Sequence, residues 1–136
     1  MTSQLHDLTL KLAEANYQGH TFNCLTIPGD QEVLQVSVSQ QEELPIYVTV
    51  TETQILCIVY LFRESEVRES AVAELNERCL QLNVPMPLSA FAKIDEHYAL
   101  FGALSICSLF DNIMREIITL SDNSAAALEV VEDLLK

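Results

Sequence analysis

The order of the hydrophobic patterns along the chain restricts its fold most strongly. Apolar residues first recur at helical spacing, then alternate in three runs, return to helical spacing, alternate in two more runs and end in a long helical stretch. Residues three to four apart line one face of a helix, whereas alternation is typical of a half-buried strand. The sequence therefore predicts an α+β domain with an antiparallel sheet of about five strands. The expected order is helix, three strands, helix, two strands, helix.

The first three strands are predicted to form a meander. Apolar and polar residues alternate over 32–39 and again over 46–51, which indicates strands with one wet face. The run 54–62 is apolar at nearly every position, so this strand should be central or covered on both faces. Short links between the runs favour antiparallel pairing. Before them, residues 20–30 predict only a short irregular strand.

Two amphipathic helices flank this meander. The first should begin at a capping Ser3, run to about Tyr17 and end at Gly19. The second should begin at a capping Ser65 and run to Leu82, because the prolines that follow cannot continue a helix.

The rest of the chain predicts a second hairpin over 88–104 and a final helix from about 108 to 135. The polar residues 121–124 could interrupt this helix, so two shorter helices are an alternative. Small residues recur in the hairpin and would let a helix or another chain's backbone lie close, and ordinary packing of a helix on the sheet is the favoured explanation. These residues are Ala90, Ala92, Ala99, Gly102 and Ala103.

The length and net charge of the chain limit the classes of function that it can have. A chain of 136 residues, 49% of them hydrophobic, is expected to fold as one domain over residues 1–136. Its apolar runs are too short to span a bilayer and no signal region begins it, which predicts a cytoplasmic protein without membrane insertion. With 20 acidic and seven basic residues the net charge is -13, which disfavours nucleic acid as a partner. The acidity either serves solubility alone, or protects an apolar binding patch and attracts basic clients.

The sequence contains none of the common catalytic motifs, and we expect neither an enzyme nor a bound cofactor or metal. The four cysteines are too widely spaced for a metal site and are expected as reduced core residues. Asp95 could orient His97 for general base chemistry, but a polar hairpin turn explains this cluster better. Acidic pairs such as Asp30 with Glu32 lack the dense spacing of a cation site and are assigned to loops.

Two resemblances extend this interpretation. In topology, size and acidity the chain resembles the small type III secretion chaperones and the YbjN-like proteins. In sequence, residues 84–105 and 116–123 resemble the bacterial YjfI-like family, a domain of unknown function. The chaperone resemblance implies a homodimer with client segments wrapped around its outside. The YjfI-like resemblance brings no catalytic residues, and suggests a coiled-coil membrane-stress protein as a client.

Our main hypothesis is an acidic, non-enzymatic protein-binding module, a dimeric chaperone-like or adaptor protein that holds a partner segment. Its expected partner or dimer surface comprises Val67, Ala71, Leu75, Phe91 and Phe101. The alternative is a small-molecule-binding regulator or minor enzyme with a pocket between the sheet and the final helix. In that case Asp95, His97 and Tyr98 would supply the polar groups. A structural subunit that only assembles is the third possibility.

Overall fold

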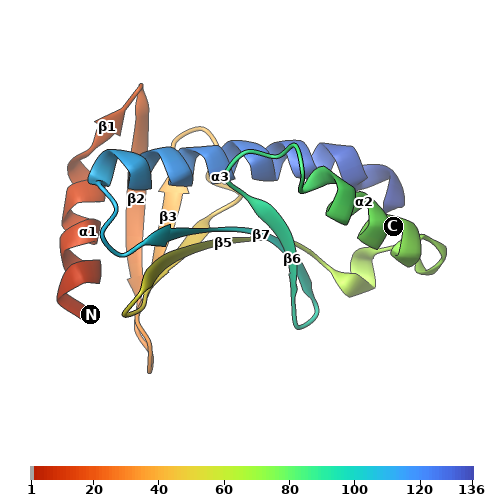
Figure 1. Ribbon diagram of the computed structural model, residues 1–136, viewed down its shortest axis with the longest axis horizontal. Coiled ribbons are helices and arrows are strands. Elements are labelled where there is room, and N and C mark those ends of the chain that lie inside the picture. The colour runs from red at the N-terminus through yellow and green to blue at the C-terminus, as the bar shows by residue number, and fades with distance from the viewer. Residues whose placement is uncertain (1) are drawn as a thin grey trace.

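Seven antiparallel strands form one sheet in the order β1-β2-β3-β4-β5-β7-β6 (Figure 1). The computed structural model describes residues 2–136, and the side chains from residue 4 onward. The strands are β1 Asn16–Tyr17, β2 His20–Ile27, β3 Val33–Val38, β4 Ile46–Val50, β5 Gln54–Arg63, β6 Ala90–Ile94 and β7 His97–Ser105. The first five form a meander, and β7 joins the β6–β7 hairpin to β5. The predicted α+β class and antiparallel sheet are confirmed.

The prediction of about five strands was wrong, because β1 and β2 also belong to the sheet. β1 has only two residues, too few for alternation to be visible in a sequence. β2 carries polar residues among its apolar ones, which led to the prediction of a short irregular strand. It nevertheless pairs with β3 from Phe22 to Ile27. The neighbouring strand, which local sequence does not reveal, makes this segment regular.

Three helices accompany the sheet: α1 Thr2–Glu14, α2 Val72–Leu82 and α3 Phe110–Val131. Single 3₁₀ turns cover Glu64–Glu66, Glu69–Ala71 and Glu132–Leu134. In Figure 1, α3 runs across one face of the sheet, α1 lies beside β2, and α2 lies at the opposite end. Within residues 2–136, none of the helices has the length and apolarity needed to cross a membrane.

Both ends of α1 differ from the prediction. The helix begins at Thr2, before the expected cap Ser3, whose side chain lies outside the described ones. It ends at Glu14 because Asn16 and Tyr17 pair with β2. Gly19, the predicted helix stop, lies instead in the β1–β2 turn with φ +86°, and its N–H donates to Asn16 Oδ1 over 3.1 Å.

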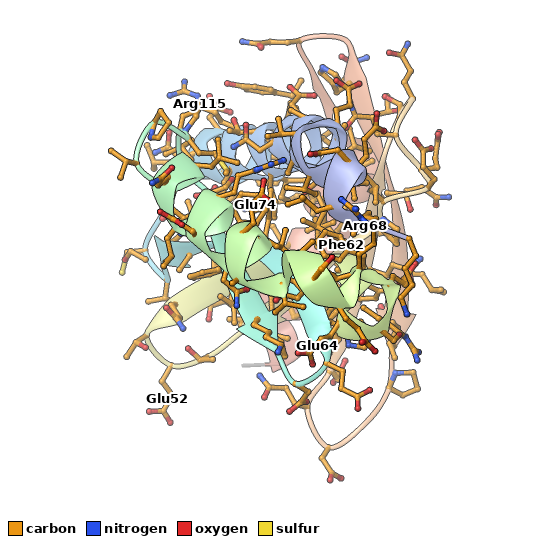
Figure 2. The ribbon with its side chains drawn as sticks, turned by 90° about the vertical axis from the view of Figure 1, so that its right-hand side faces the viewer. Glu52, Phe62, Glu64, Arg68, Glu74 and Arg115 are labelled. Carbon is orange, nitrogen blue, oxygen red and sulfur yellow. The ribbon has the colours of Figure 1, made fainter. Side chains whose placement is uncertain are left out.

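The second helix starts later than predicted. Val67 forms a bridge with Leu135, and the Arg68 N–H donates to Leu134 O over 3.1 Å. These contacts hold the predicted first turns of the helix in 3₁₀ and extended conformations, so α2 starts at Val72 and not at Ser65. Arg68 also donates to Asp133 O, and Figure 2 shows it beside the carboxyl-terminal end of α3. Pairing with the chain's carboxyl-terminal end therefore overrides the helical pattern.

The final helix is continuous through residues 121–124. Two polar side chains of this stretch have partners outside the helix: Ser121 Oγ donates to Gln41 Oε1, and Asn123 Nδ2 donates to Pro87 O. These two side chains therefore do not compete for the helix backbone. Ser124 Oγ donates to Leu120 O one turn back, a bond that a continuous helix accommodates.

The apolar faces of all three helices and the covered face of the sheet form one core. Its completely buried large side chains include Leu12, Leu34, Ile46, Leu75, Leu100, Ile117 and Leu120. Burial of each such side chain stabilises the fold by about 1.5–3 kcal/mol. Cys57 and Cys79 are free and buried as predicted, and Cys24 is half-buried. Cys107 is exposed, which corrects the prediction, because it lies in the turn between β7 and α3.

Candidate protein-binding surface

One face of the sheet has no helix over it within residues 2–136 (Figure 1). In β3, β4 and the first part of β5, every second residue is buried under the helices and the residues between them are only partly buried. These intervening residues point to the opposite side, because side chains alternate along a strand. We call this side the outer sheet face. Its central residues are Leu25, Gln35, Tyr47, Thr49, Leu56, Ile58, Tyr60, Ala90, Ala92, Ala99, Phe101 and Ala103.

Strand register aligns the outer sheet face across the molecule. A continuous row of paired residues crosses six strands, in the order Leu25, Gln35, Tyr47, Ile58, Phe101 and Ala90. Beside this row the Tyr60 ring lies 5.7 Å from the Tyr47 ring and 5.2 Å from the His97 ring, measured between centroids. At about 4.8 Å between strands, the row is about 24 Å long.

The outer sheet face carries almost no charge. None of the 20 acidic residues occupies an outward position in the described strands, and the one charged residue there is Arg63, at the end of β5. Its polar residues, such as Gln35, Ser37 and Thr49, are uncharged. In a chain of net charge -13, this broad surface without acids is the candidate contact surface.

The five residues predicted as a partner surface do not lie together on an exposed face. Val67 and Ala71 are buried in the segment before α2, and Leu75 is buried on α2 itself. Phe91 is buried on the covered face of β6. The helical stripe and the strand pattern that contain these four residues indicate a core as readily as an interface. Phe101 does lie at the centre of the outer sheet face, and its role there stays a prediction.

The polar residues of the alternative site do not form a catalytic cluster. Asp95 and Glu96 form the exposed β6–β7 turn, and Tyr98 is buried, with its hydroxyl donating to Asn76 Oδ1 over 2.7 Å. Within residues 2–136, no hydrogen bond joins Asp95 to His97 or Tyr98. A hollow of about 180 Å³ lies where α1 and the start of α3 meet the ends of β4 and β5. None of these polar residues lines it.

A buried carboxyl lies on the covered face. Glu116 of α3 is 4% exposed, and its Oε2 atom has no hydrogen-bond partner among the described residues. A Cβ at Gly102 would lie 2.6 Å from this oxygen, so Gly102 makes room for the carboxyl. Burial raises the pKa of Glu116 to about 6, and burial together with the Glu116 charge raises the pKa of Cys57 to about 12. A thiol with this pKa stays protonated and provides no activated nucleophile.

The small residues of the second hairpin lie on both faces of the sheet: Gly102 on the covered face and the alanines on the outer sheet face. Gly102 permits the close approach of α3, in agreement with ordinary packing of a helix on a sheet. The four alanines alternate onto the outer sheet face, which no helix of the described chain covers. Ala90, Ala92 and Ala103 are partly or fully exposed there, whereas Ala99 is buried.

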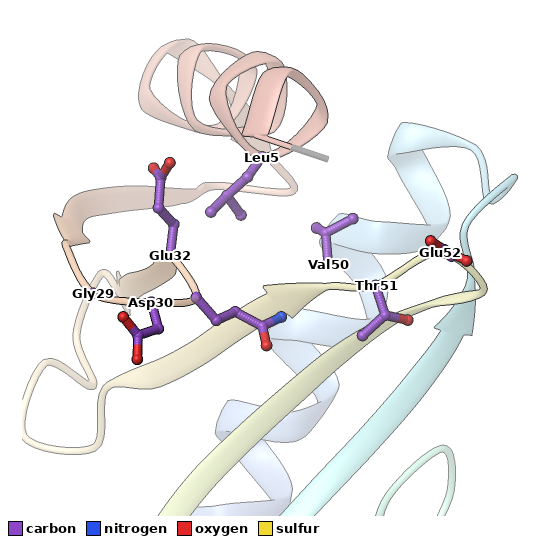
Figure 3. Close-up of a pocket in the computed structure, with 8 residues that line it drawn as sticks. Leu5, Gly29, Asp30, Glu32, Val50, Thr51 and Glu52 are labelled. Atoms are coloured by element: carbon purple, nitrogen blue, oxygen red, sulfur yellow. The ribbon is translucent and has the colours of Figure 1, made fainter.

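An acidic hollow of about 420 Å³ lies between α1 and two turns at one end of the sheet (Figure 3). Asp30, Glu32 and Glu52 line it, but in Figure 3 their carboxylates point in different directions. Among the described residues, no group of three or more histidine, cysteine or acidic side chains could hold a metal ion. Asp30 and Glu32 lie in the β2–β3 connection, as the loop assignment predicts.

The sequence of the chain identifies its family. The model of a family described as "Uncharacterized protein conserved in bacteria (DUF2170)" matches residues 2–135. The chain belongs to this family. It is also 26% identical over 113 residues to the "Uncharacterized protein YjfI" of Escherichia coli strain K12, covering 80% of this chain and 84% of YjfI. The predicted YjfI-like relationship is confirmed.

Two solved structures share the fold. A chain of the heterodimeric ExoU–SpcU complex, from the type III secretion system of Pseudomonas aeruginosa, superimposes with a TM-score of 0.56 and 16% identity. The match covers 98% of this chain and 96% of that one. YbjN from E. coli superimposes with a TM-score of 0.61 and 16% identity, covering 99% and 92%. The predicted likeness to secretion chaperones and YbjN-like proteins is therefore confirmed for the fold.

Most residues of the outer sheet face were not predicted as a surface, although the sequence contains a signal for them. The run 54–62 is apolar at nearly every position and predicts a strand that is central or covered on both faces. β5 is central, yet helices cover only one of its faces. The outward residues Leu56, Ile58 and Tyr60 are thus the part of the pattern that packing within the chain does not explain.

Proposed function

We propose that this chain is a non-catalytic, chaperone-like protein-binding module that forms a homodimer and holds a segment of a partner protein. The outer sheet face carries the proposal. It is broad, apolar at its centre and free of acidic residues. The fold shared with a chain of the ExoU–SpcU complex supports a role in protein binding. Coiled-coil membrane-stress proteins are the client class to test first.

The outer sheet face has almost no charge, so a partner surface that is also uncharged suits it best, and the same face of a second copy is such a surface. Two copies with a net charge of -13 each repel one another, and this repulsion is weakest where the surfaces that meet contain no acids. The row of about 24 Å is comparable with the width of a standard interface, which buries about 800 Å² on each partner. Two outer sheet faces around a twofold axis would place Ile58 and Phe101 near the centre of the contact.

The oligomeric state in solution tests this arrangement. Ala103→Glu places a charge on the outer sheet face at an exposed position, and Ala73→Glu makes the same change on the exposed side of α2. Sedimentation equilibrium should find dimers for the wild type and Ala73→Glu. For Ala103→Glu the dimer dissociation constant should rise at least about tenfold, because two charges would lose water at the interface.

Circular dichroism would verify that both variants keep the native content of helix and strand. A wild type that stays monomeric up to millimolar concentration would overturn the dimer. So would equal dimerisation of the two folded variants.

A further inference from the structure

A second apolar surface lies on the other side of the molecule, between α2 and α3. We call it the α2–α3 groove, and its volume is about 230 Å³. The residues that line it are Leu82, Pro85, Met86, Pro87, Phe91, Asn123, Ala126, Ala127 and Val130. Beside it, Val84 is 87% exposed and Leu88 is 55% exposed. This volume is below the 300–1,000 Å³ typical of small-molecule pockets, and suits a few apolar side chains of a protein partner.

Hydrogen bonds hold the loop that forms one wall of the groove. Asn83 Oδ1 accepts from the Phe91 N–H over 2.7 Å, and Asn123 Nδ2 donates to Pro87 O over 2.9 Å and to Ser89 Oγ over 3.0 Å. The apolar side chains of residues 84–88 are therefore presented on a fixed backbone. A preformed wall reduces the entropy lost when a partner binds.

The backbone groups in the walls of the groove restrict the conformation that a bound segment can adopt. Pro85 and Pro87 have no N–H, and Pro87 O is already bonded to Asn123. The opposite wall is α3, whose backbone groups are bonded within the helix. An extended segment would find few free backbone partners along these two walls, and the Phe91 N–H of the β6 edge is already bonded to Asn83. A helix satisfies its own backbone, so a helix fits the α2–α3 groove.

The acidic residues near the groove indicate the charge that a bound helix should carry. Asp122 and Glu129 are exposed and lie one turn to either side of Ala126, on the α3 wall. The nearby Arg78 is already paired, with Glu74 at 2.6 Å and Asp133 at 2.8 Å. The groove thus combines an apolar floor with two exposed acids beside it, Asp122, which also accepts from Gln41 Nε2 over 3.2 Å, and Glu129. Basic residues beside the apolar stripe of the partner helix would complement it.

We infer that the α2–α3 groove binds a basic amphipathic helix of a partner protein. This inference rests on the proposed protein-binding function, for which it names the partner and the site. It is independent of the dimer, because the α2–α3 groove and the outer sheet face share no residue.

A designed peptide tests the inference directly. The probe is an 18-residue fluorescent peptide with leucines at positions i, i+3, i+4 and i+7 and lysines elsewhere, compared with a peptide in which glutamates replace the lysines. Fluorescence anisotropy should show binding of the lysine peptide and at least about tenfold weaker binding of the glutamate peptide. Ala126→Arg should weaken binding of the lysine peptide at least tenfold. Ala73→Arg, the same change on α2 outside the groove, should leave it unchanged.

NMR chemical shifts of the full chain locate the bound peptide. Shifts at Val84, Ala126 and Val130 would support the groove. Shifts confined to Ile58 and Ala103 would overturn it, as would equal binding of the two peptides or equal affinity of the two variants. Ala103→Glu, the variant expected to weaken the dimer, should still bind the lysine peptide. A wild type that binds in the groove but never dimerises would refute only the dimer, and a dimer without binding would refute only the groove.

Discussion

Glu116 has the least favourable surroundings for a charge among the described carboxyl groups, since it is buried and Oε2 has no partner. Burial raises its pKa from 4.5 to about 6 in the folded chain. The folded state therefore holds this proton more tightly than the unfolded state. The associated stabilisation is fully present below pH 4.5 and is lost as pH rises past about 6. The difference of about 1.5 pKa units corresponds to about 2 kcal/mol.

Glu116→Gln should therefore stabilise the protein at neutral pH, because the amide keeps the shape of the side chain without its charge. Urea unfolding at pH 7.5 should show a gain of about 2 kcal/mol, which falls to less than half at pH 5. Glu129→Gln, an exposed position on the same helix, should change stability little at either pH. A gain of the same size at both pH values would show that Glu116 does not titrate as described.

At the level of elements, Gln41 joins the β3–β4 loop to the middle of α3. Its Oε1 accepts from the buried Ser121 hydroxyl, and its Nε2 donates to Asp122 Oδ1 over 3.2 Å. Gln41→Ala would leave the Ser121 hydroxyl buried without its acceptor, which costs about 1–3 kcal/mol. Urea unfolding should detect this loss. Gln81→Ala, an exposed glutamine on α2, should stay within about 0.5 kcal/mol of the wild type; equal stabilities of the two variants would refute the bridging role.

Local patterns predicted the elements well where packing follows the same period. The alternation in β3 and β4 and the helical stripe of α3 correspond directly to buried faces. Predictions were wrong where distant residues decide the conformation. The bridge from Val67 to Leu135 delays the start of α2, and pairing with β3 makes β2 a full strand. The continuity of α3 similarly depends on Gln41, some eighty residues away in the sequence.

At the level of the whole molecule, the candidate surface was the hardest feature to predict. An apolar residue that packs in the core and one that contacts a partner give the same sequence pattern, so the sequence does not distinguish Leu75 from Phe101. Only the arrangement of layers separates them, because it shows which face of the sheet the helices cover. The structure also places all 20 acidic residues in helices, turns and loops and none in the described strands, so the outer sheet face contains no acid.

The dependence of dimerisation on salt follows from this distribution of charge. Two chains of net charge -13 repel across the solvent, while the proposed contact brings together no pairs of opposite charge. The Debye length falls from about 30 Å at 0.01 M salt to about 10 Å at 0.1 M, so salt screens the repulsion and leaves apolar contact intact. The dimer dissociation constant, measured by sedimentation, should therefore fall several-fold between about 0.02 M and 0.3 M sodium chloride. The lysine peptide should respond in the opposite direction, because its binding depends on attraction between opposite charges. A dimer that weakens as salt is added would place the contact on charged surface, and therefore away from the outer sheet face.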